Sequence, residues 1–322
     1  MRHCLIIGAG MAGLMAARTL TRNGIKVTIL EKSGGVGGRM ATRRIGHAVF
    51  DHGAQFITVR SPVFREQIES MIKKGIVREW CSGFLPEKPD GHARYIGTNG
   101  MTGIAKYLAR DLNIRLNERA LFLSFKNDKW QILTEKDETL VSDSLIMTAP
   151  VPQTLNLMKT AGLDQQNIIE EELGSIYYDR CLALLVTMEN TQVLDPPGGL
   201  QLSGEPMTWI ADNRMKGISP EATAVTIHAG PEFSRKYWEK DDKWIGQNIL
   251  YTAGGWLRGK HLSYQLKRWL YSQPRIIYDD RCYARFEPGP VIFAGDAFGG
   301  PKVEGAALSG ISAARKLLEY LA

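Results

Sequence analysis

The first thirty residues alternate between apolar runs and polar breaks in the order strand, helix, strand. Residues 4–7 (CLII) form a short apolar run that ends at Gly8, and residues 11–24 (MAGLMAARTLTRNG) carry apolar side chains at helical spacing up to Gly24. Residues 26–32 (KVTILEK) alternate again and are rich in β-branched side chains, which is typical of a strand. This order predicts a βαβ unit, in which a helix joins two parallel strands.

The rest of the chain shows two kinds of pattern. Up to Pro150 we expect a helix over residues 100–112 and strands at residues 119–125, 129–135 and 144–150. We assign all of them to the domain that holds the βαβ unit. Between Pro152 and about Pro274 the pattern changes to short strands with aromatics and prolines between them. These strands are residues 181–188, 207–213 and 224–230, and one helix is expected from about Asp241 to Tyr251. The tail returns to a strand, a glycine-rich turn and a long helix.

Three glycines in the βαβ unit indicate what this unit binds. Gly8, Gly10 and Gly13 have the spacing G-x-G-x-x-G, which allows a tight turn, a close approach of a pyrophosphate and tight packing of helix on strand. The helix that begins at Met11 and Ala12 directs its positive dipole end at the phosphates. Glu31, followed by Lys32, ends the second strand and is placed to accept hydrogen bonds from a ribose 2′-hydroxyl. The motif therefore predicts a dinucleotide site.

Length and pattern together predict two domains and an α/β fold class, in the α+β two-domain arrangement. The chain has 322 residues, and a single domain usually has fewer. We expect a discontinuous Rossmann-like dinucleotide-binding domain made of residues 1–60, 96–150 and 285–322. A second, sheet-rich domain, made of residues 61–95 and 151–284, is expected to bind the substrate.

Composition excludes several functional classes. Although 44% of the residues are hydrophobic, no window approaches the roughly 20 apolar residues of a membrane span, and the N-terminal apolar run is too short for a signal peptide, so we expect a cytoplasmic protein without membrane contact. The four cysteines lie far apart without a CxxC pair, which argues against zinc, and no metal is expected.

The net charge of +6 and the pI near 9.0 favour anionic ligands. The basic residues are scattered among 34 acidic ones, with no basic block longer than TRR at residues 42–44, so we expect no nucleic-acid partner. The charge fits either a generally basic surface or the attraction of a phosphorylated small ligand.

A second glycine cluster decides which dinucleotide is expected. Gly37, Gly38 and Arg39 follow shortly after Glu31, and near the end VIFAGDAF is followed by VEGAALSGISAA. In these motifs the sequence resembles the glutathione-reductase-type flavoproteins, in the branch that holds the amine oxidases and renalase. The resemblance implies a p-hydroxybenzoate-hydroxylase-like architecture and bound FAD, with the Arg39 side chain on the pyrophosphate. The further FAD contacts that it implies come from Met40, Gln55, Ala120, Thr148, Asp296, Val303, Glu304, Gly305 and Ala306. No cysteine lies in the tail, so we expect the FAD to be noncovalent.

Within this branch the resemblance to bacterial renalases extends over most of the chain. It includes FDHGAQFIT from Phe50, YIGTNGM before Thr102, IHAGPEFSRKYWE around His228 and RWLYSQP from Arg268. The resemblance implies an oxidase that takes a hydride from 2- or 6-dihydronicotinamide dinucleotides and passes the electrons to O2 as H2O2. The isomer, and the choice between NAD and NADP, stay open. Such a substrate aromatises as it loses the hydride and needs no general base, so few catalytic residues are expected.

Candidate substrate residues are Gln55, Trp269, Tyr271 and His228. Trp269 and Tyr271 lie two residues apart in an expected strand and could face the same side of a sheet, as substrate contacts or as ordinary core aromatics. Gln55 follows a turn of small residues, and His228 fits either a substrate contact or a structural histidine bonded to backbone.

Two alternatives remain at this point. An amine or other small-molecule oxidase or desaturase of the same branch is one; many such enzymes use a lysine near the flavin, and Lys267 and Lys302 are the lysines nearest to the motifs. The other is an FAD-containing binding protein without turnover.

Overall fold

The computed structural model describes residues 2–87, 90–162, 166–189 and 191–322, and the chain divides into two compact units. Unit 1 contains residues 1–38, 105–177 and 274–322, and unit 2 contains residues 39–104 and 178–273.

Unit 1 is built on a six-stranded sheet whose four central strands are buried. Its strands, in spatial order, are β17 (Tyr283–Arg285), β18 (Val291–Phe293), β11 (Ser144–Met147), β1 (His3–Ile7), β2 (Lys26–Leu30) and β7 (Ile114–Arg115). All neighbours pair in parallel except β17 and β18. Parallel strands put their carboxyl ends at one edge of a sheet, so the loops after β1, β11 and β18 meet there.

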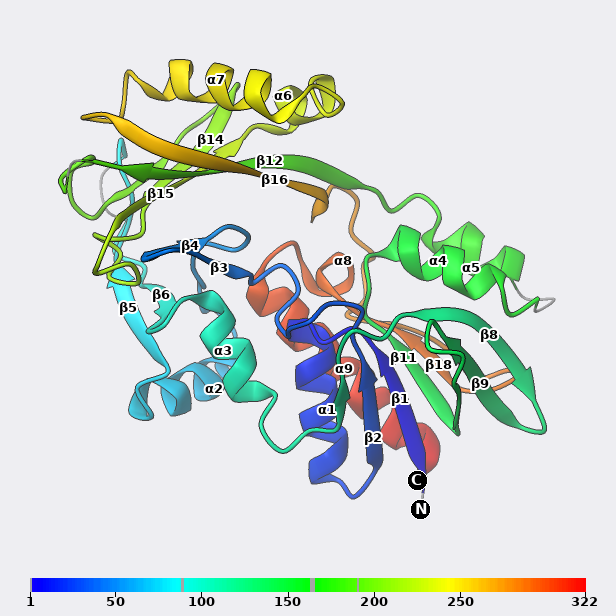
Figure 1. Ribbon diagram of the computed structural model, residues 1–322. Coiled ribbons are helices and arrows are strands. Elements are labelled where there is room, and N and C mark those ends of the chain that lie inside the picture. The colour runs from blue at the N-terminus through cyan, green and yellow to red at the C-terminus, as the bar shows by residue number, and fades with distance from the viewer. Residues whose placement is uncertain (1, 88–89, 163–165, 190) are drawn as a thin grey trace. The chain divides into compact units, whose positions relative to one another are not determined.

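Helices α1 (Met11–Arg22) and α9 (Val303–Leu321) lie side by side against this sheet, in blue and red in Figure 1. The approach is very close, because a Cβ added to Gly310 would lie 2.1 Å from the carbonyl oxygen of Ala12. The predicted βαβ unit is thus confirmed, with α1 ending just before Gly24.

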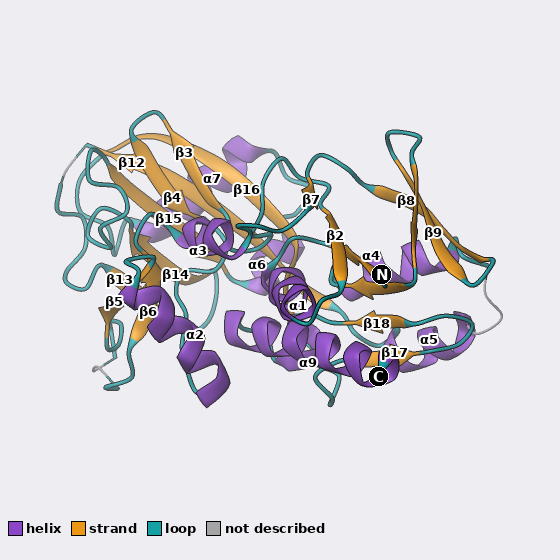
Figure 2. Ribbon diagram, turned by 90° about the horizontal axis from the view of Figure 1, so that it is seen from below, coloured by secondary structure: helices purple, strands orange, loops and turns teal. Residues whose placement is uncertain are grey.

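The strands expected at residues 119–135 form a separate antiparallel sheet rather than joining the parallel one. This sheet consists of β8 (Ala120–Lys126), β9 (Lys129–Thr134) and β10 (Thr139–Ser142), and Figure 2 shows β8 and β9 as a long hairpin. Trp130 anchors it, fully buried, with its Nε1 donating to Pro290 O over 2.9 Å. Unit 1 also contains α4 (Val151–Lys159), α5 (Gln166–Leu173) and α8 (Asp296–Gly299).

Unit 2 is built on a five-stranded sheet. Its strands, in spatial order, are β13 (Gly199–Gln201), β14 (Met207–Asp212), β15 (Thr223–Ala229), β12 (Tyr178–Met188) and β16 (His261–Pro274). Helices α6 (Pro231–Lys236) and α7 (Asp242–Ala253) cover one face, as Figure 1 shows, over a core of aliphatic side chains. Helix α7 confirms the helix that the sequence predicts near Asp241, whose side chain caps it by accepting from the Trp244 amide over 2.9 Å.

The other face of this sheet is covered by the hairpin of β3 (Thr42–Ile45) and β4 (Ala48–Asp51). Phe50 of β4 is fully buried against Leu185 and Ala224. The remaining elements around this hairpin are α2 (Pro62–Lys73), β5 (Val77–Cys81), β6 (Arg94–Gly97) and α3 (Met101–Leu108).

The division into units differs from the domain limits expected from the sequence. Those limits assign residues 39–60 and 96–104 to the dinucleotide domain, whereas in the structure these residues pack in unit 2. Residues 151–177 and 274–284, expected in the substrate domain, pack in unit 1. The hairpin at residues 42–51 explains the first difference, because its apolar face is buried on the sheet of unit 2.

Candidate functional site

The glycine loop of unit 1 has the geometry that a dinucleotide site requires. Gly8 has φ +107°, which favours glycine, and a Cβ on Gly13 would lie 2.0 Å from Gly8 O. By contrast, a Cβ on Gly10 would have no atom within 4 Å. Two of the glycines are therefore required by the protein's own packing, while Gly10 borders open space that a ligand could approach.

Helix α1 begins directly behind this open space. Its N-cap is Gly10, which has no side chain to cap the helix. The first amide groups of a helix have no partner within the helix, and with the helix dipole they favour an anion. Met11 and Ala12 thus lie where the sequence predicts phosphate contacts.

Glu31 connects the glycine loop to the next turn. Its Oε2 accepts from the Ala9 amide over 2.9 Å and its Oε1 accepts from the Ser33 amide over 2.8 Å, and the residue is buried. Each carboxylate oxygen has a further lone pair for a ribose hydroxyl. Lys32 is exposed, and its Nζ lies 3.3 Å from Gln153 Oε1.

Ala120 lies on a segment that runs beside Glu31. The Glu118 amide donates to Glu31 O over 2.9 Å, and Ala120 begins β8 two residues later. The structure therefore places Ala120, an expected FAD contact, two residues from a direct backbone contact of Glu31, the expected ribose contact.

Thr148 joins the ends of β1 and β11. Its hydroxyl donates to Ile7 O over 2.8 Å and lies 3.2 Å from Gly8 O. From β1 the chain runs through α1 to β2 on one side, while β11 lies on the other side of β1, so the strand order reverses between β1 and β11. Ligands of open α/β sheets bind at such a switch point.

The C-terminal motif meets the same edge of the sheet. β18 pairs with β11 in parallel, and Asp296, which is buried, begins α8 just after β18. Helix α9 then begins at Val303 without a side-chain cap. Unit 1 thus presents a second helix N-terminus, as the resemblance to flavoproteins implies.

Packing explains one further position of this motif, Gly305. A Cβ on Gly305 would lie 2.3 Å from Gly300 O, so the turn before α9 requires glycine. Glu304 is buried beside it, and the Ala306 amide donates to Lys302 O over 3.0 Å.

The second glycine cluster contacts the first within unit 1. The Gly37 amide donates to Ala9 O over 2.8 Å, and Gly38, at φ +52°, has its Cβ position 3.5 Å from Gly10 Cα. Gly37 and Gly38 both have positive φ, at +114° and +52°, which explains why glycine occupies these two positions.

Arg39 and Met40 continue into unit 2. The Arg39 guanidinium donates to Ser272 O over 3.3 Å and lies 5.5 Å from the centre of the Tyr178 ring. Met40 is buried, and its carbonyl accepts from the Thr102 hydroxyl over 2.9 Å. The contact of Arg39 with a pyrophosphate stays a prediction.

Three candidate substrate residues of unit 2 meet around the segment His52–Gln55. The carbonyl of His52 accepts from Trp269 Nε1 over 2.9 Å and from His228 Nε2 over 3.2 Å. The His52 ring stacks on Trp269, with 5.2 Å between ring centres and 24° between planes. The structure thus brings together Trp269, His228 and a histidine that the sequence analysis did not select.

Tyr271 faces a different neighbour. Its ring lies edge-on to Tyr178, with 5.7 Å between ring centres, and Tyr178 is the residue over which Arg39 lies. Trp269 and Tyr271 both lie in β16, two residues apart, and that they face the same side stays a prediction from this spacing.

Gln55 is held by its amide nitrogen. Its Nε2 donates to Asp51 O over 2.7 Å and to Gly53 O over 3.0 Å. Its Oε1 is buried and has no hydrogen-bond partner among the described residues, and the same holds for His52 Nδ1. Gln55 Nε2 is also 3.5 Å from His228 Nε2, but both nitrogens carry hydrogens toward carbonyls, so this contact is not a hydrogen bond.

Both histidines are neutral at neutral pH. Burial lowers the pKa of His228 to about 4, and burial, together with the nearby Lys267 charge, lowers the pKa of His52 to about 4. Neutral imidazoles can bind and orient a substrate without adding charge.

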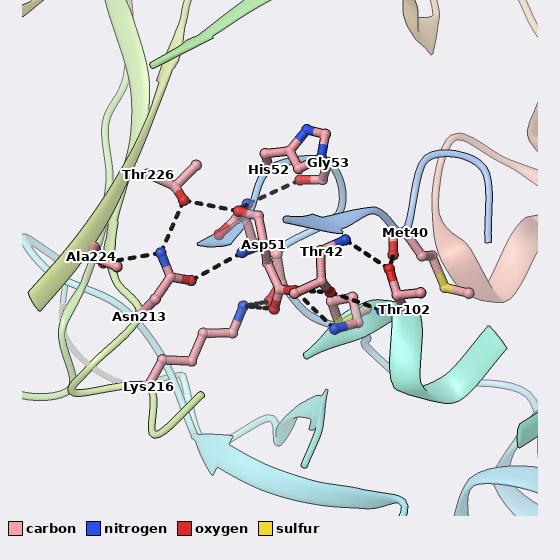
Figure 3. Close-up of polar contacts among 12 residues, drawn as sticks. Met40, Thr42, Asp51, His52, Gly53, Thr102, Asn213, Lys216, Ala224 and Thr226 are labelled. Carbon is pink, nitrogen blue, oxygen red and sulfur yellow. Dashed lines mark hydrogen bonds and ion pairs between the residues drawn. The ribbon is translucent and has the colours of Figure 1, made fainter. Parts of the chain in front are cut away.

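The sequence analysis also missed a buried ion pair beneath this segment. Figure 3 shows Lys216 directed at Asp51, with Asn213 and Thr226 on neighbouring strands and loops. The only signal for Asp51 and His52 was the stretch FDHGAQF, from which the analysis selected Gln55 alone. No local pattern marked Lys216, whereas Lys267 and Lys302 were considered.

Comparison with known families identifies the fold. A model of NAD(P)-binding Rossmann-like domains matches residues 6–71, and a model of flavin containing amine oxidoreductases matches residues 84–318. The chain belongs to the flavin-containing amine oxidoreductase family. It is a flavin-dependent oxidoreductase, which sets aside the alternative of a binding protein without turnover.

Individual relatives agree with this assignment. Renalase of Mus musculus is 24% identical over 352 aligned residues, with 100% of both chains covered, so the renalase-like prediction is confirmed. The putrescine oxidase of Kocuria rosea is 44% identical over 57 residues, which are 18% of this chain and 12% of the relative.

Solved structures show the fold. A putative protoporphyrinogen oxidase from Exiguobacterium sp. 255-15 has a TM-score of 0.76 at 14% identity, and a putrescine oxidase with bound putrescine has a TM-score of 0.71 at 14% identity. Each comparison covers 99% of both chains. The expected class, a Rossmann-like domain with a second sheet-rich domain, is confirmed.

The described residues contain neither a helix suited to a membrane nor a cluster suited to a metal ion. No helix in these residues combines the length and apolar character needed to cross a bilayer. No group of three or more His, Cys, Asp and Glu side chains there could hold a metal ion.

Proposed function

We propose that the protein is an oxidase of 2- or 6-dihydronicotinamide dinucleotides that uses noncovalently bound FAD and O2. The observation that carries the proposal is the similarity to renalase along the whole chain. Its support in the structure comes from unit 1 for the cofactor and from unit 2 for the substrate.

FAD fits the residues of unit 1. The Cβ position of Gly10 is open, the N-termini of α1 and α9 carry no side-chain cap, and Glu31 keeps lone pairs for a ribose. No cysteine occurs in α8 or α9, which supports noncovalent binding. When bound, the flavin supplies hydride-accepting and O2-reducing chemistry, so that a dihydronicotinamide, O2 and one proton become NAD(P)+ and H2O2.

The residues of unit 2 suit a carboxamide on the substrate ring. A carboxamide carries an N–H donor, which Gln55 Oε1 can accept, and a carbonyl acceptor beside it. His52 Nδ1 can pair with such a group in either neutral tautomer, because one tautomer donates and the other accepts. Trp269 holds the His52 ring by stacking and the His52 carbonyl by its Nε1 hydrogen bond.

Charge in unit 2 supports an anionic substrate. The positive charges of Lys267 and Arg43 both lower the pKa of His52. The pKa of Lys267 is itself lowered, mainly by burial and further by the charge of Arg43. Cations grouped near the candidate residues would attract the phosphates of a dinucleotide.

The decisive experiment is anaerobic stopped-flow reduction of the bound flavin. We expect fast reduction by 2- or 6-dihydro-NAD, slower reduction at high salt because screening weakens attraction of an anion, and poor reduction by ordinary 4-dihydro-NADH. Rapid bleaching by benzylamine-type amines without response to the dihydro isomers would instead establish the amine-oxidase alternative.

A matched pair of variants tests the role of His52. His52→Phe keeps an aromatic ring on Trp269 but removes Nδ1, and we expect the Kd for the substrate to rise about tenfold while FAD stays bound. Phe56→Leu is the control, since Phe56 belongs to a separate aromatic cluster with Phe84 and Trp209. An unchanged Kd in His52→Phe would remove His52 from the substrate site.

A further inference from the structure

Lys216 and Asp51 form a fully buried ion pair in unit 2. Their side chains are each 0% exposed, and Lys216 Nζ lies 2.7 Å from Asp51 Oδ2. Burial lowers the pKa of Lys216, which shows that the surroundings penalise its charge, while Asp51 favours it. Removing two charges from water costs several kcal/mol, and apolar pairs of similar volume are often as stable. Stability alone therefore does not account for this pair.

The pair ties together the two ends of the segment Asp51–Gln55. Besides binding Asp51, Lys216 Nζ donates to the backbone carbonyl of Gln55 over 2.6 Å. The other end of the segment is held through Asp51 O, which accepts from Thr226 Oγ1 over 2.9 Å and from Gln55 Nε2 over 2.7 Å. One buried ammonium group thus fixes the distance between the start of the segment and its end.

Asp51 is held from further directions. Its Oδ1 accepts from the Thr42 hydroxyl over 2.6 Å and from the Met101 amide over 2.9 Å. Its amide donates to Asn213 Oδ1 over 3.3 Å, and Asn213 Nδ2 donates to Thr226 Oγ1 over 2.9 Å (Figure 3). The carboxylate therefore has little freedom to move with the segment.

The loop that carries Lys216 is itself fixed. Asp212 Oδ1 accepts from the amides of Arg214 and Met215 over 2.9 and 3.1 Å, and the Lys216 amide donates to Asp212 O over 2.8 Å. Lys216 Nζ also lies 5.1 Å from the centre of the Trp80 ring, which favours a cation there.

The segment tied in this way carries the groups proposed to contact the substrate. These are His52, whose carbonyl receives Trp269 and His228, and Gln55, whose Oε1 has no partner among the described residues. We propose that Lys216 and Asp51 are positioning residues, which hold the segment His52–Gln55 in the conformation that presents these groups to the substrate. The inference rests on the proposed substrate site and deepens it.

The test compares two neutral replacements of the pair with the wild-type holoenzyme. D51N/K216M removes both charges and the tie to the Gln55 carbonyl, while avoiding a single unpaired buried charge that could prevent folding. D51N/K216Q also removes both charges, but its amides can still bridge to that carbonyl. Leu184→Ala, in the buried core of the same sheet, is the control for lost stability alone.

Two quantities are measured in each variant that retains FAD: the limiting rate of anaerobic flavin reduction, and the Kd for NAD+ by titration of the oxidised enzyme. We expect D51N/K216M to lower the limiting rate by about 10- to 100-fold and to raise the Kd, because a misplaced contact of about 1 Å has such an effect. D51N/K216Q should stay closer to wild type, and Leu184→Ala should change neither quantity.

Equal values in D51N/K216M and wild type would overturn the proposal, as would equal effects of the two double variants. The test can still be carried out if the proposed substrate is wrong. If the wild-type flavin is reduced by an amine and not by the dihydro isomers, the proposed function is wrong, and the same variants compared with that amine still decide whether the pair positions the segment.

Discussion

The glycine loop allows a sharp separation of folding from cofactor binding, by comparing Gly13→Ala with Gly10→Ala. The Cβ of an alanine at position 13 would lie 2.0 Å from Gly8 O, well inside the normal contact distance, and the obstacle is backbone that belongs to the βαβ turn. Overpacking of this kind typically costs about 1–3 kcal/mol, because α1 has to move away from β1. We expect the apo form of Gly13→Ala to lose stability by that amount and to bind FAD poorly.

Gly10→Ala should behave in the opposite way. Gly10 has φ −77° and ψ −177°, which any residue adopts, and no atom lies within 4 Å of its Cβ position. Losing a glycine N-cap destabilises the fold, while the lower conformational entropy of the unfolded chain with alanine stabilises it. Each effect is at most about 1 kcal/mol, and the two oppose each other, so apo stability should hardly change. A methyl group in the space where the pyrophosphate is proposed to lie should still weaken FAD by about tenfold or more, about 1.4 kcal/mol.

The assays are urea denaturation of the apo protein and fluorescence titration with FAD. The reasoning is refuted if Gly10→Ala binds FAD as tightly as wild type, since then no ligand approaches Gly10. It is equally refuted if the apo form of Gly13→Ala is as stable as wild type.

Three more outcomes are expected. Acid or heat should release all FAD into the supernatant, and flavin that stays with the precipitated chain would contradict noncovalent binding. Arg39→Ala should weaken FAD by about 1.5–3 kcal/mol if its guanidinium contacts the pyrophosphate, whereas an unchanged Kd in a binding titration would place Arg39 elsewhere. Because the pKa values of His52 and His228 fall from 6.5 to about 4 on folding, the unfolded chain binds more protons between these values. The free energy of unfolding should therefore reach its full value above pH 6.5 and fall toward pH 4, by up to about 1.4 kcal/mol per pH unit for each imidazole. His228→Asn should show a smaller fall. If urea denaturation gave the same fall for wild type and His228→Asn, this would argue against a neutral His228.

The dinucleotide motif could be predicted because its causes are local. Gly8, Gly13 and Glu31 are constrained by turn geometry, by contact between neighbouring elements and by the end of a strand, and all three constraints act within one βαβ unit. A periodic pattern and a glycine spacing are sufficient to detect such constraints.

The division of the chain could not be predicted in the same way. After Gly38 the composition does not change, yet residues 39–104 pack in unit 2. The reason is the burial of Phe50 against Leu185 and Ala224, residues more than a hundred positions away. Contacts of this kind leave no periodic signal in either segment.

The role of Lys216 could not be predicted from the sequence either, because it too depends on a long-range contact. Its partner Asp51 is 165 positions away, and a lone lysine in a loop usually indicates a solvated side chain. Only the fold shows that its charge is enclosed. His52 was overlooked for a related reason, because its value as a candidate depends on Trp269 stacking from a strand 217 positions away.

These differences suggest how function could change in this fold. The dinucleotide motif in unit 1 acts mainly through backbone groups, whose positions depend on Gly8 and Gly13, which packing does not allow to vary, so most changes there should lose the cofactor. The candidate substrate groups in unit 2 are side chains on a segment whose backbone is fixed from beneath by Lys216 and Asp51. A single substitution at position 52 can therefore replace a polar group without moving the segment. We expect variants at this position to alter the choice of substrate while the protein stays yellow.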